Sequence, residues 1–316
     1  MNFKRFVVNG VALCALCLAG LKYAAAQQPP ETNGVPVQMV VTVEPHKGAN
    51  MPSVSASDVM VMEGKDRDRV TGWVPALGDH AGLEFFILID DSLDRNVALQ
   101  FSDIRKFIDE QPPATQVGIA YMQNGIARVE QKLTNDHALA DKALRLPLGI
   151  RGVNASPYFA VTDLVKHWPK GNNRREVLIV SDGIDLYYGV GDLLDPYLQS
   201  AIEDAQKAGI LVSVIYSPGI GHFAHSYWQT YWGQLYLAEL AEKTGGESYY
   251  IGMTGAPVEF ASYLSDLAKR LNQQYLLGFI AKPEKKAGLR MVRVKTELQK
   301  VDLVAPNQVF VPATPE

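Results

Sequence analysis

The sequence predicts an α/β fold built on a doubly wound, mostly parallel sheet, and three observations carry this prediction. Two apolar runs stop abruptly at Asp90 and at Asp182, as strands buried on both faces of a parallel sheet do. Strand-like and helix-like segments alternate over residues 83–273, which is typical of a sheet covered by helices on both faces. Asn124-Gly125 joins two strand-like segments, and this hairpin signal predicts one antiparallel edge strand.

The predicted helices carry their own start and stop signals. Residues 96–110 place apolar side chains on one face, and Pro112 follows as a stop. Ser156 before Pro157 is a typical helix start, because serine caps the helix and proline fits its first position. The predicted order is a strand to Asp90, helix 96–110, strands 116–122 and 127–133, helices 136–146 and 157–168, a strand to Asp182, helix 196–208, strand 210–216, helix 227–243, strand 248–251 and helix 256–272.

Shorter β segments flank this region on both sides. Before it, residues 35–43, 58–63 and 70–73 read as strands, and after it residues 275–281 and 289–297 do so again. Because strand-like segments stand at both ends, we expect them to pair into a small accessory β unit. The predicted division is a signal peptide (1–26), an N-terminal β segment (27–82), the α/β domain (83–273), and C-terminal strands with a polar, proline-containing tail (274–316).

The N-terminal segment reads as a secretory signal peptide. Lys4 and Arg5 precede an apolar stretch, and small residues up to Ala26 supply a cleavage site. A retained membrane anchor is the alternative, but the apolar stretch is shorter than the roughly 20 residues a bilayer span needs. We therefore expect an exported protein, periplasmic or secreted, with no membrane span after cleavage.

Cleavage would change the composition of the chain. Both cysteines, Cys14 and Cys17, lie in the removed segment, which excludes disulfides and thiolate metal sites from the mature chain. The remainder holds 27 basic and 34 acidic residues, a net charge of −7. An acidic exported chain is a poor candidate for binding nucleic acid or anionic membranes.

Oxygen-bearing side chains gather where the predicted parallel strands end. The carboxyl ends of such strands form the edge at which ligands bind in open α/β sheets. Carboxylate and hydroxyl oxygens are ligands for hard divalent cations, here Mg²⁺, with Ca²⁺ or Mn²⁺ as alternatives. The structural alternative is that these residues only cap helices and satisfy loop amides. The candidate metal ligands are Asp90, Ser92, Asp94, Ser156 and Asp182.

This pattern resembles the metal-ion-dependent adhesion site of von Willebrand factor type A domains. In that family the first strand ends in Asp-x-Ser-x-Ser, a second loop supplies a Thr, and a third loop supplies an Asp. Here Asp94 stands at the second Ser, Ser156 stands at the Thr, and Asp182-Gly183 matches the third loop. The resemblance implies a divalent ion whose open position accepts an acidic residue of a protein partner.

A narrower resemblance covers most of the remaining chain. Residues 54–64 are similar to a phrase near the N-terminus of bacterial exported type A proteins described as acidobacterial-type. Residues 240–246, 274–279 and 289–296 resemble the phrases that close the type A domain and begin its C-terminal strands. This narrower resemblance implies the fold and an exported location. The leading expectation for function is a non-catalytic protein-binding module in adhesion or assembly. The alternatives are a metal-independent scaffold that binds through an aromatic surface, and a hydrolase that uses a metal-activated water.

Aromatic residues supply the candidate partner-binding surface. Tyr187 and Tyr188 follow the Asp182 motif and would lie at the same edge. Trp228 and Trp232 belong to a helical stripe with Tyr231 and Leu235, which predicts either a core face or, for part of it, a binding surface. His222 and His225 form a weak zinc signal, since a third ligand is missing.

Overall fold

A six-stranded, mostly parallel sheet lies at the centre of the α/β region among the residues that the structure, a computed structural model, describes (34–189, 195–218, 226–249 and 259–313). Its strand order is β6-β5-β4-β7-β8-β9, and β6 pairs antiparallel with β5 while the other neighbours are parallel. The predicted doubly wound sheet with one antiparallel edge strand is therefore confirmed. The strands are β4 (Leu83–Asp90), β5 (Thr115–Gln123), β6 (Ile126–Thr134), β7 (Arg174–Ser181), β8 (Ile210–Tyr216) and β9 (Ser248–Tyr249).

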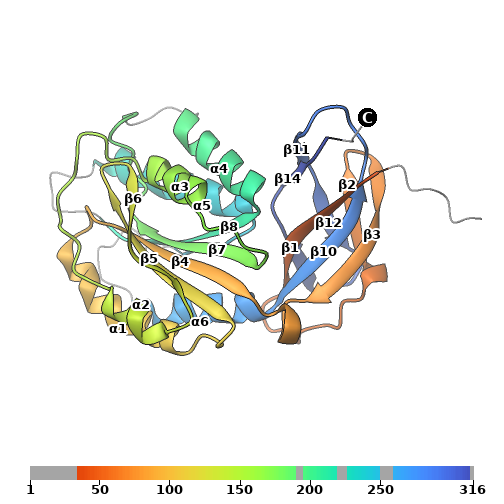
Figure 1. The fold of residues 1–316 in the computed structure, drawn as a ribbon, viewed down its shortest axis with the longest axis horizontal. Helices are drawn as coiled ribbons and strands as arrows, with labels where there is room; N and C mark the ends of the chain where they lie inside the picture. The colour runs from red at the N-terminus through yellow and green to blue at the C-terminus, as the bar shows by residue number, and fades with distance from the viewer. Residues whose placement is uncertain (1–33, 190–194, 219–225, 250–258, 314–316) are drawn as a thin grey trace, which may run out of the picture. The chain divides into compact units, whose positions relative to one another are not determined.

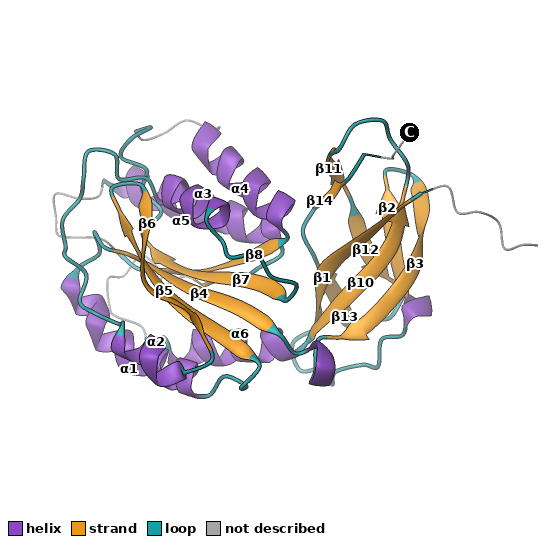
Figure 2. Ribbon diagram, viewed as in Figure 1, coloured by secondary structure: helices purple, strands orange, loops and turns teal. Residues whose placement is uncertain are grey.

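Helices cover both faces of this sheet, as Figure 1 and Figure 2 show. Strand β4 contributes side chains to both layers, because Phe85, Ile87 and Ile89 pack on one face while Phe86 and Leu88 pack on the other. This two-sided burial explains why its sequence is apolar throughout. One face carries α1 (Phe101–Asp109), α2 (His137–Lys142) and α6 (Ala261–Asn272), and the opposite face carries α3 (Pro157–Lys166), α4 (Pro196–Ala208) and α5 (Tyr227–Thr244).

Some helix bounds differ from those the sequence predicts. The helix expected over residues 96–110 begins as a 3₁₀ helix, η3 (Arg95–Gln100), before α1. The helix expected over 136–146 ends at Lys142, because the chain turns there into a loop that runs toward the carboxyl edge of the sheet. Short 3₁₀ turns also occur at η1 (Ala56–Asp58) and η2 (Gly78–His80).

Strands from both ends of the described chain form a second sheet with the order β12-β2-β3-β10-β1-β13. Strands β1 and β10 run antiparallel with Val35 opposite Ala281, which confirms the expected accessory β unit. A separate pair, β11 with β14, lies alongside. The strands are β1 (Val35–Pro45), β2 (Val59–Glu63), β3 (Asp66–Pro75), β10 (Gln274–Ala281), β11 (Gly288–Met291), β12 (Arg293–Thr296), β13 (Val301–Val304) and β14 (Gln308–Val311).

The C-terminal strands are more numerous than the sequence predicts. The single strand expected over residues 289–297 is divided at Val292, whose amide donates to the carbonyl of Asn307. The segment expected to be a polar tail contains β14, with Val309 and Val311 buried. Alternating burial over four residues is too short a pattern to stand out beside the prolines of that segment.

The chain enters and leaves the α/β region through neighbouring strands of the second sheet. Strand β3 leads to β4, and α6 leads directly to β10, which pairs with β3. At this junction Gln274 Nε2 donates to the buried Glu176 carboxylate at 2.9 Å, and Arg174 donates to the carbonyl of Leu271 at 2.7 Å. Residues Gly34–Glu316 accordingly form one compact unit.

Candidate binding site at the carboxyl edge of the α/β sheet

Asp90 and Asp182 meet where the neighbouring strands β4 and β7 end. These strands lie at the point where the strand order reverses direction, which is the usual ligand position in such sheets. Asp90 accepts hydrogen bonds from Ser92 N (2.9 Å), Ser92 Oγ (2.7 Å) and Ser181 Oγ (2.8 Å). Burial, with the Asp182 charge as a second cause, raises the pKa of Asp90.

Asp182 carries a partner that the sequence pattern does not reveal, namely the guanidinium of Arg151. Arg151 Nη2 donates to Asp182 Oδ2, and the amide of Ile184 donates to Asp182 Oδ1 at 3.0 Å. Only 14% of the Arg151 side chain is exposed, and that of Asp182 is buried. Burial raises the pKa of Asp182, while the positive charge of Arg151 opposes this rise.

Arg151 belongs to a loop, residues 145–155 (the Arg151 loop), that is tied to the end of β4. The tie is Asp91, whose carboxylate accepts two hydrogen bonds from Arg145 and one from the amide of Leu148 at 2.8 Å. Its carbonyl accepts from the amide of Gly149 at 2.9 Å. Burial works against ionisation of Asp91, but the hydrogen bonds, chiefly from Arg145, outweigh it and lower the pKa.

Ser156 serves as a helix cap and as a link to the third loop. Its hydroxyl accepts from the amide of Phe159 at 3.3 Å, which is the predicted cap of α3, and donates to Asp185 Oδ2 at 2.6 Å. Asp185 Oδ1 in turn accepts from the amides of Tyr187 (2.8 Å) and Tyr188 (2.9 Å). The conformation of the loop that carries Tyr187 and Tyr188 (the tyrosine loop) therefore depends on the buried carboxylate of Asp185.

A cavity of about 20 Å³ lies among these groups, with Asp90, Ser92, Ser156 and Arg151 in its lining. A volume of this size holds about one water molecule. Three predicted ligands thus line one cavity, and Asp182 joins them through Arg151. Asp94 does not line the cavity; instead its carboxylate caps η3 by accepting from the amide of Asn96 at 2.8 Å.

These donors do not fit a divalent ion in the observed arrangement. Mg²⁺ needs near-octahedral oxygen ligation, and the third-loop carboxylate that would contribute to it already bonds a guanidinium. A second cation placed in the cavity would be repelled by the buried charge of Arg151. Within the described part of the chain, no group of three or more acidic, histidine or cysteine side chains is placed to hold a metal.

The predicted aromatic residues fall into two groups. Tyr187, Tyr188 and Trp228 are exposed, with 62% of Trp228 accessible to solvent. Trp232 instead packs against the core between the sheet and α3–α5. The stripe of Trp228, Tyr231, Trp232 and Leu235 is therefore a core face only at Trp232, since the other three side chains are exposed.

Sequence reasoning missed Asp91, Arg145, Arg151 and Asp185 as organisers of this site. Asp91 directly follows the predicted ligand Asp90, and Asp185 comes three residues after Asp182. The motif assigns no role to either. Arg151 lies in a stretch without periodicity, where no pattern identifies a partner.

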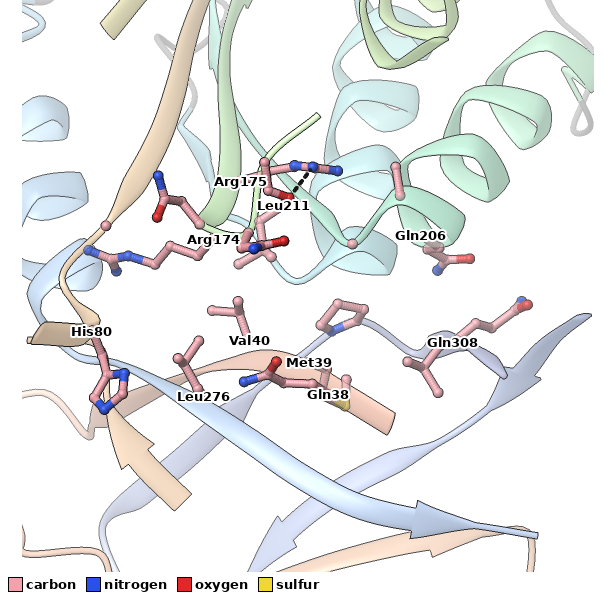
Figure 3. A pocket seen from close by; sticks show the side chains of 18 of the residues that line it. Gln38, Met39, Val40, His80, Arg174, Arg175, Gln206, Leu211, Leu276 and Gln308 are labelled. Atoms are coloured by element: carbon pink, nitrogen blue, oxygen red, sulfur yellow. Dashed lines mark hydrogen bonds between the residues drawn. The ribbon is translucent and has the colours of Figure 1, made fainter. Parts of the chain in front are cut away.

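A larger cavity, of about 360 Å³, lies at the opposite end of the parallel strands (Figure 3). Figure 3 shows Arg174, Arg175 and Leu211 on one side and Val40 and Leu276 on the other. Arg175 is already bonded to Glu84 and to the carbonyl of Gly171. This cavity is distinct from the candidate site, since the two share no lining residue.

Several expectations concern residues outside the described ones. The predicted signal peptide (1–26) and the His222 and His225 pair fall there. So do the end of the predicted strand 248–251 and the start of the predicted helix 256–272, within residues 250–258. Among the residues that are described, no helix combines the length and the apolar character needed to cross a membrane.

No family model matches the sequence, and no curated protein matches it. Among solved structures, an aerotolerance-related membrane protein from Bacteroides fragilis is 16% identical, with 60% of this chain and 99% of that chain covered and a TM-score of 0.44. A von Willebrand factor type A protein from Catenulispora acidiphila is 11% identical over 90% of this chain and 76% of that chain, also with a TM-score of 0.44. The type A domain of SpRpn10 is 17% identical, with 58% of this chain and 93% of that chain covered and a TM-score of 0.39. The fold assignment rests on strand order and direction rather than on these distant likenesses.

Proposed function

We propose that this protein is an exported, non-catalytic module that binds a protein partner at the carboxyl edge of the α/β sheet. One observation carries the proposal: the segments that border the buried polar cluster at this edge carry exposed aromatic and aliphatic side chains. They come from the loop after β7, from the start of α5 and from the Arg151 loop. We call this set the aromatic rim; its members are Tyr187, Tyr188, Tyr227, Trp228 and Tyr231, with Ile150 and Val153 beside them.

The aromatic rim is held in place before a partner arrives. The Tyr187 and Tyr188 rings both contact the Tyr197 ring. Their centroids lie 5.5 Å and 6.0 Å, respectively, from the Tyr197 centroid. Trp228 contacts Tyr227 and Tyr231 in edge-to-face geometry. A surface that is already ordered loses less entropy on binding, and Tyr and Trp are the residues most enriched at binding hot spots.

The start of α5 is fixed against the polar cluster by a close backbone contact. A Cβ atom placed on Gly233 would lie 2.2 Å from the carbonyl oxygen of Asp182, so glycine allows the helix to approach the loop. The rim residues of α5 and of the tyrosine loop therefore sit on one rigid base. This arrangement supports a partner that presents apolar side chains, with polar groups for the tyrosine hydroxyls.

The polar cluster supports structure rather than catalysis. The hydroxyls of Ser92, Ser156 and Ser181 donate to the carboxylates of Asp90 and Asp185, and none of the three is paired with a histidine as in the common serine nucleophiles. The described residues that line the cavity include no histidine, lysine or cysteine, and its volume admits no substrate. A hydrolase is therefore the least supported of the three candidate functions.

Metal-dependent adhesion is the second candidate, favoured by the meeting of Asp90, Ser92 and Asp182. It requires a partner carboxylate to complete the shell of an ion. The pairing of Arg151 with Asp182 favours binding without an ion, so we place the apolar rim first. The proposed export rests on the N-terminal segment, and the narrower family resemblance belongs to the same proposal.

Site-directed photo-crosslinking in producing cells tests the proposed location of the partner. A benzoylphenylalanine placed at Tyr188 is expected to give a discrete protein adduct, whereas one at the exposed Lys170, before β7, is expected to give none. Trp228→Ala should weaken the adduct, and Met291→Ala, which removes an exposed apolar side chain from β11, should not. Equal adducts at both crosslinker positions, or no adduct at Tyr188, would refute a docking surface at this edge.

A further inference from the structure

Two buried carboxylates at the ends of adjacent strands require a positive partner. Asp90 and Asp182 are close enough for each charge to disfavour the other, and both are shielded from water. Amides supply hydrogen bonds to both, hydroxyls supply them to Asp90, and a largely buried cation contacts Asp182. That cation is the guanidinium of Arg151.

We propose that Arg151 is a built-in cation that takes the place of a divalent ion, so the site is metal-independent and its oxygen ligands are latent. The inference deepens the proposed function, since it states how the carboxyl edge remains ordered without a metal. Its test measures ion binding rather than partner binding, so the inference and the proposed function can fail separately.

The Arg151 loop is built to deliver this side chain. Upstream, the Asp91 carboxylate holds Arg145 at two points, and the Asp91 backbone holds Gly149. Downstream, the amide of Asn154 donates to Asn124 Oδ1 in the β5–β6 turn at 2.7 Å. Because both ends are fixed, the guanidinium is presented to Asp182 at little entropic cost.

The close fit of the turn against the loop points to the same conclusion. A Cβ on Gly125 would lie 2.8 Å from the carbonyl oxygen of Asn154, and one on Gly152 would lie 2.2 Å from Asn124 Oδ1. Glycine at both positions lets the turn and the loop approach each other immediately after Arg151. The loop is thus packed as a structural element.

A tethered guanidinium has two advantages over a diffusing ion. Its local concentration is fixed by the fold, so a positive charge faces Asp182 whatever the surrounding ion concentration. An ion that displaced it would separate a largely buried arginine from this carboxylate, and this penalty protects the pair from exchange. Arginine suits the role better than lysine, because its planar fork matches a carboxylate and it stays charged when buried.

Removing the guanidinium should expose the ligands that it now covers. Asp90, Ser92 and Ser156 line the same small cavity, and Asp182 would lose its cation. Truncation of Arg151 would also enlarge the cavity, giving room for an ion with some of its water. The resulting set of carboxylates and hydroxyls suits Mn²⁺ and Mg²⁺.

Mn²⁺ binding, followed by electron paramagnetic resonance and calorimetry, tests this inference on the chelator-treated chain. The wild type is expected to show no saturable binding up to about 1 mM, a range in which weak oxygen sites are still detected. Arg151→Ala is expected to bind one Mn²⁺ at least about tenfold more tightly than any wild-type signal. The double variant that combines Arg151→Ala with Asp182→Asn should lose this Mn²⁺ binding. Arg128→Ala, which removes an exposed arginine paired with Glu130, is the matched control and should behave as the wild type does.

Two results would overturn the inference. The first is saturable wild-type binding that disappears in Asp182→Asn, because Arg151 would then not replace the ion. The second is a folded Arg151→Ala protein that binds no Mn²⁺, because the oxygen set would then not be a latent site. If Arg151→Ala does not fold, Arg151→Met retains the packing of the side-chain stem, and the same two outcomes decide.

Discussion

Arg145 donates to both carboxylate oxygens of Asp91, with Nη1–Oδ1 and Nη2–Oδ2 distances of 2.8 and 3.0 Å. The Arg145 guanidinium also lies over the Tyr121 ring, 3.8 Å from its centroid. Asp91 is the second residue of the predicted ligand motif, where the family pattern leaves the residue type free. In this chain it holds the loop that carries Arg151, so the first motif organises the site through a residue that would not touch a metal.

Asp91→Ala is expected to lower the free energy of unfolding by about 2–4 kcal/mol, because it removes the buried carboxylate that holds a partly buried arginine at two points. Urea unfolding followed by circular dichroism measures this loss. The matched control is Glu130→Ala, since Glu130 contacts the same arginine at 3.4 Å from a more exposed position. The control should cost less than about 1 kcal/mol. Equal losses in the two variants would show that Asp91 is an ordinary surface partner.

Asp68 makes stability depend on pH in the second sheet. Burial, and then the charge of Glu63, raises the pKa of Asp68 to about 6 from its ordinary value of 3.8. Between these values the folded chain binds a proton that the unfolded chain has lost, so stability falls as the pH rises through this window. Asp68→Asn should flatten this part of the profile and stabilise the protein at pH 7 by roughly 1–2 kcal/mol.

Thermal unfolding at a series of pH values checks the Asp68 prediction. Asp79→Asn removes an equal charge from the exposed η2 turn and is the control for net charge. If the wild type instead became more stable as the pH rose over this window, the raised pKa of Asp68 would be wrong.

Gly233→Ala should disturb the contact between α5 and the Asp182 loop. Alanine favours a helix over glycine by about 1 kcal/mol, but its Cβ would lie 2.2 Å from a backbone oxygen that cannot move independently. We expect a net loss of at least about 2 kcal/mol. Gly288→Ala is the control, since a Cβ there meets nothing within 4 Å. A Gly233→Ala protein more stable than the wild type would exclude the close approach.

Asp185→Ala should loosen the tyrosine loop without unfolding the protein. The amides of Tyr187 and Tyr188 lose their common acceptor, and we expect their hydrogen exchange to accelerate by about tenfold or more. Asp185→Asn retains the oxygen that accepts from these amides and is expected to restore most of the protection. Unchanged exchange in Asp185→Ala would mean that the aromatic contacts alone order the loop.

Much of the fold follows from local patterns. The apolar runs that end at Asp90 and Asp182 become neighbouring strands, and Asn124 takes the positive φ of 51° that the predicted hairpin turn requires. The cap at Ser156 forms as expected, because capping depends only on residues within one helical turn. The sequence did not predict strand β14, because this strand is only four residues long and forms by pairing with the distant strand β11.

The candidate site likewise combines features that local patterns predict with features that only tertiary packing sets. The sequence by itself determined that Asp90, Ser92, Ser156 and Asp182 come to one edge, since strand order and strand ends follow from hydrophobic pattern and connectivity. Only the tertiary structure decided what stands beside them. Arg151 pairs with Asp182, Asp94 caps η3, and Trp232 turns inward while Trp228 stays exposed. Those outcomes depend on how a loop and a helix end pack across the sheet, and no local periodicity encodes a contact between residues so far apart in the chain.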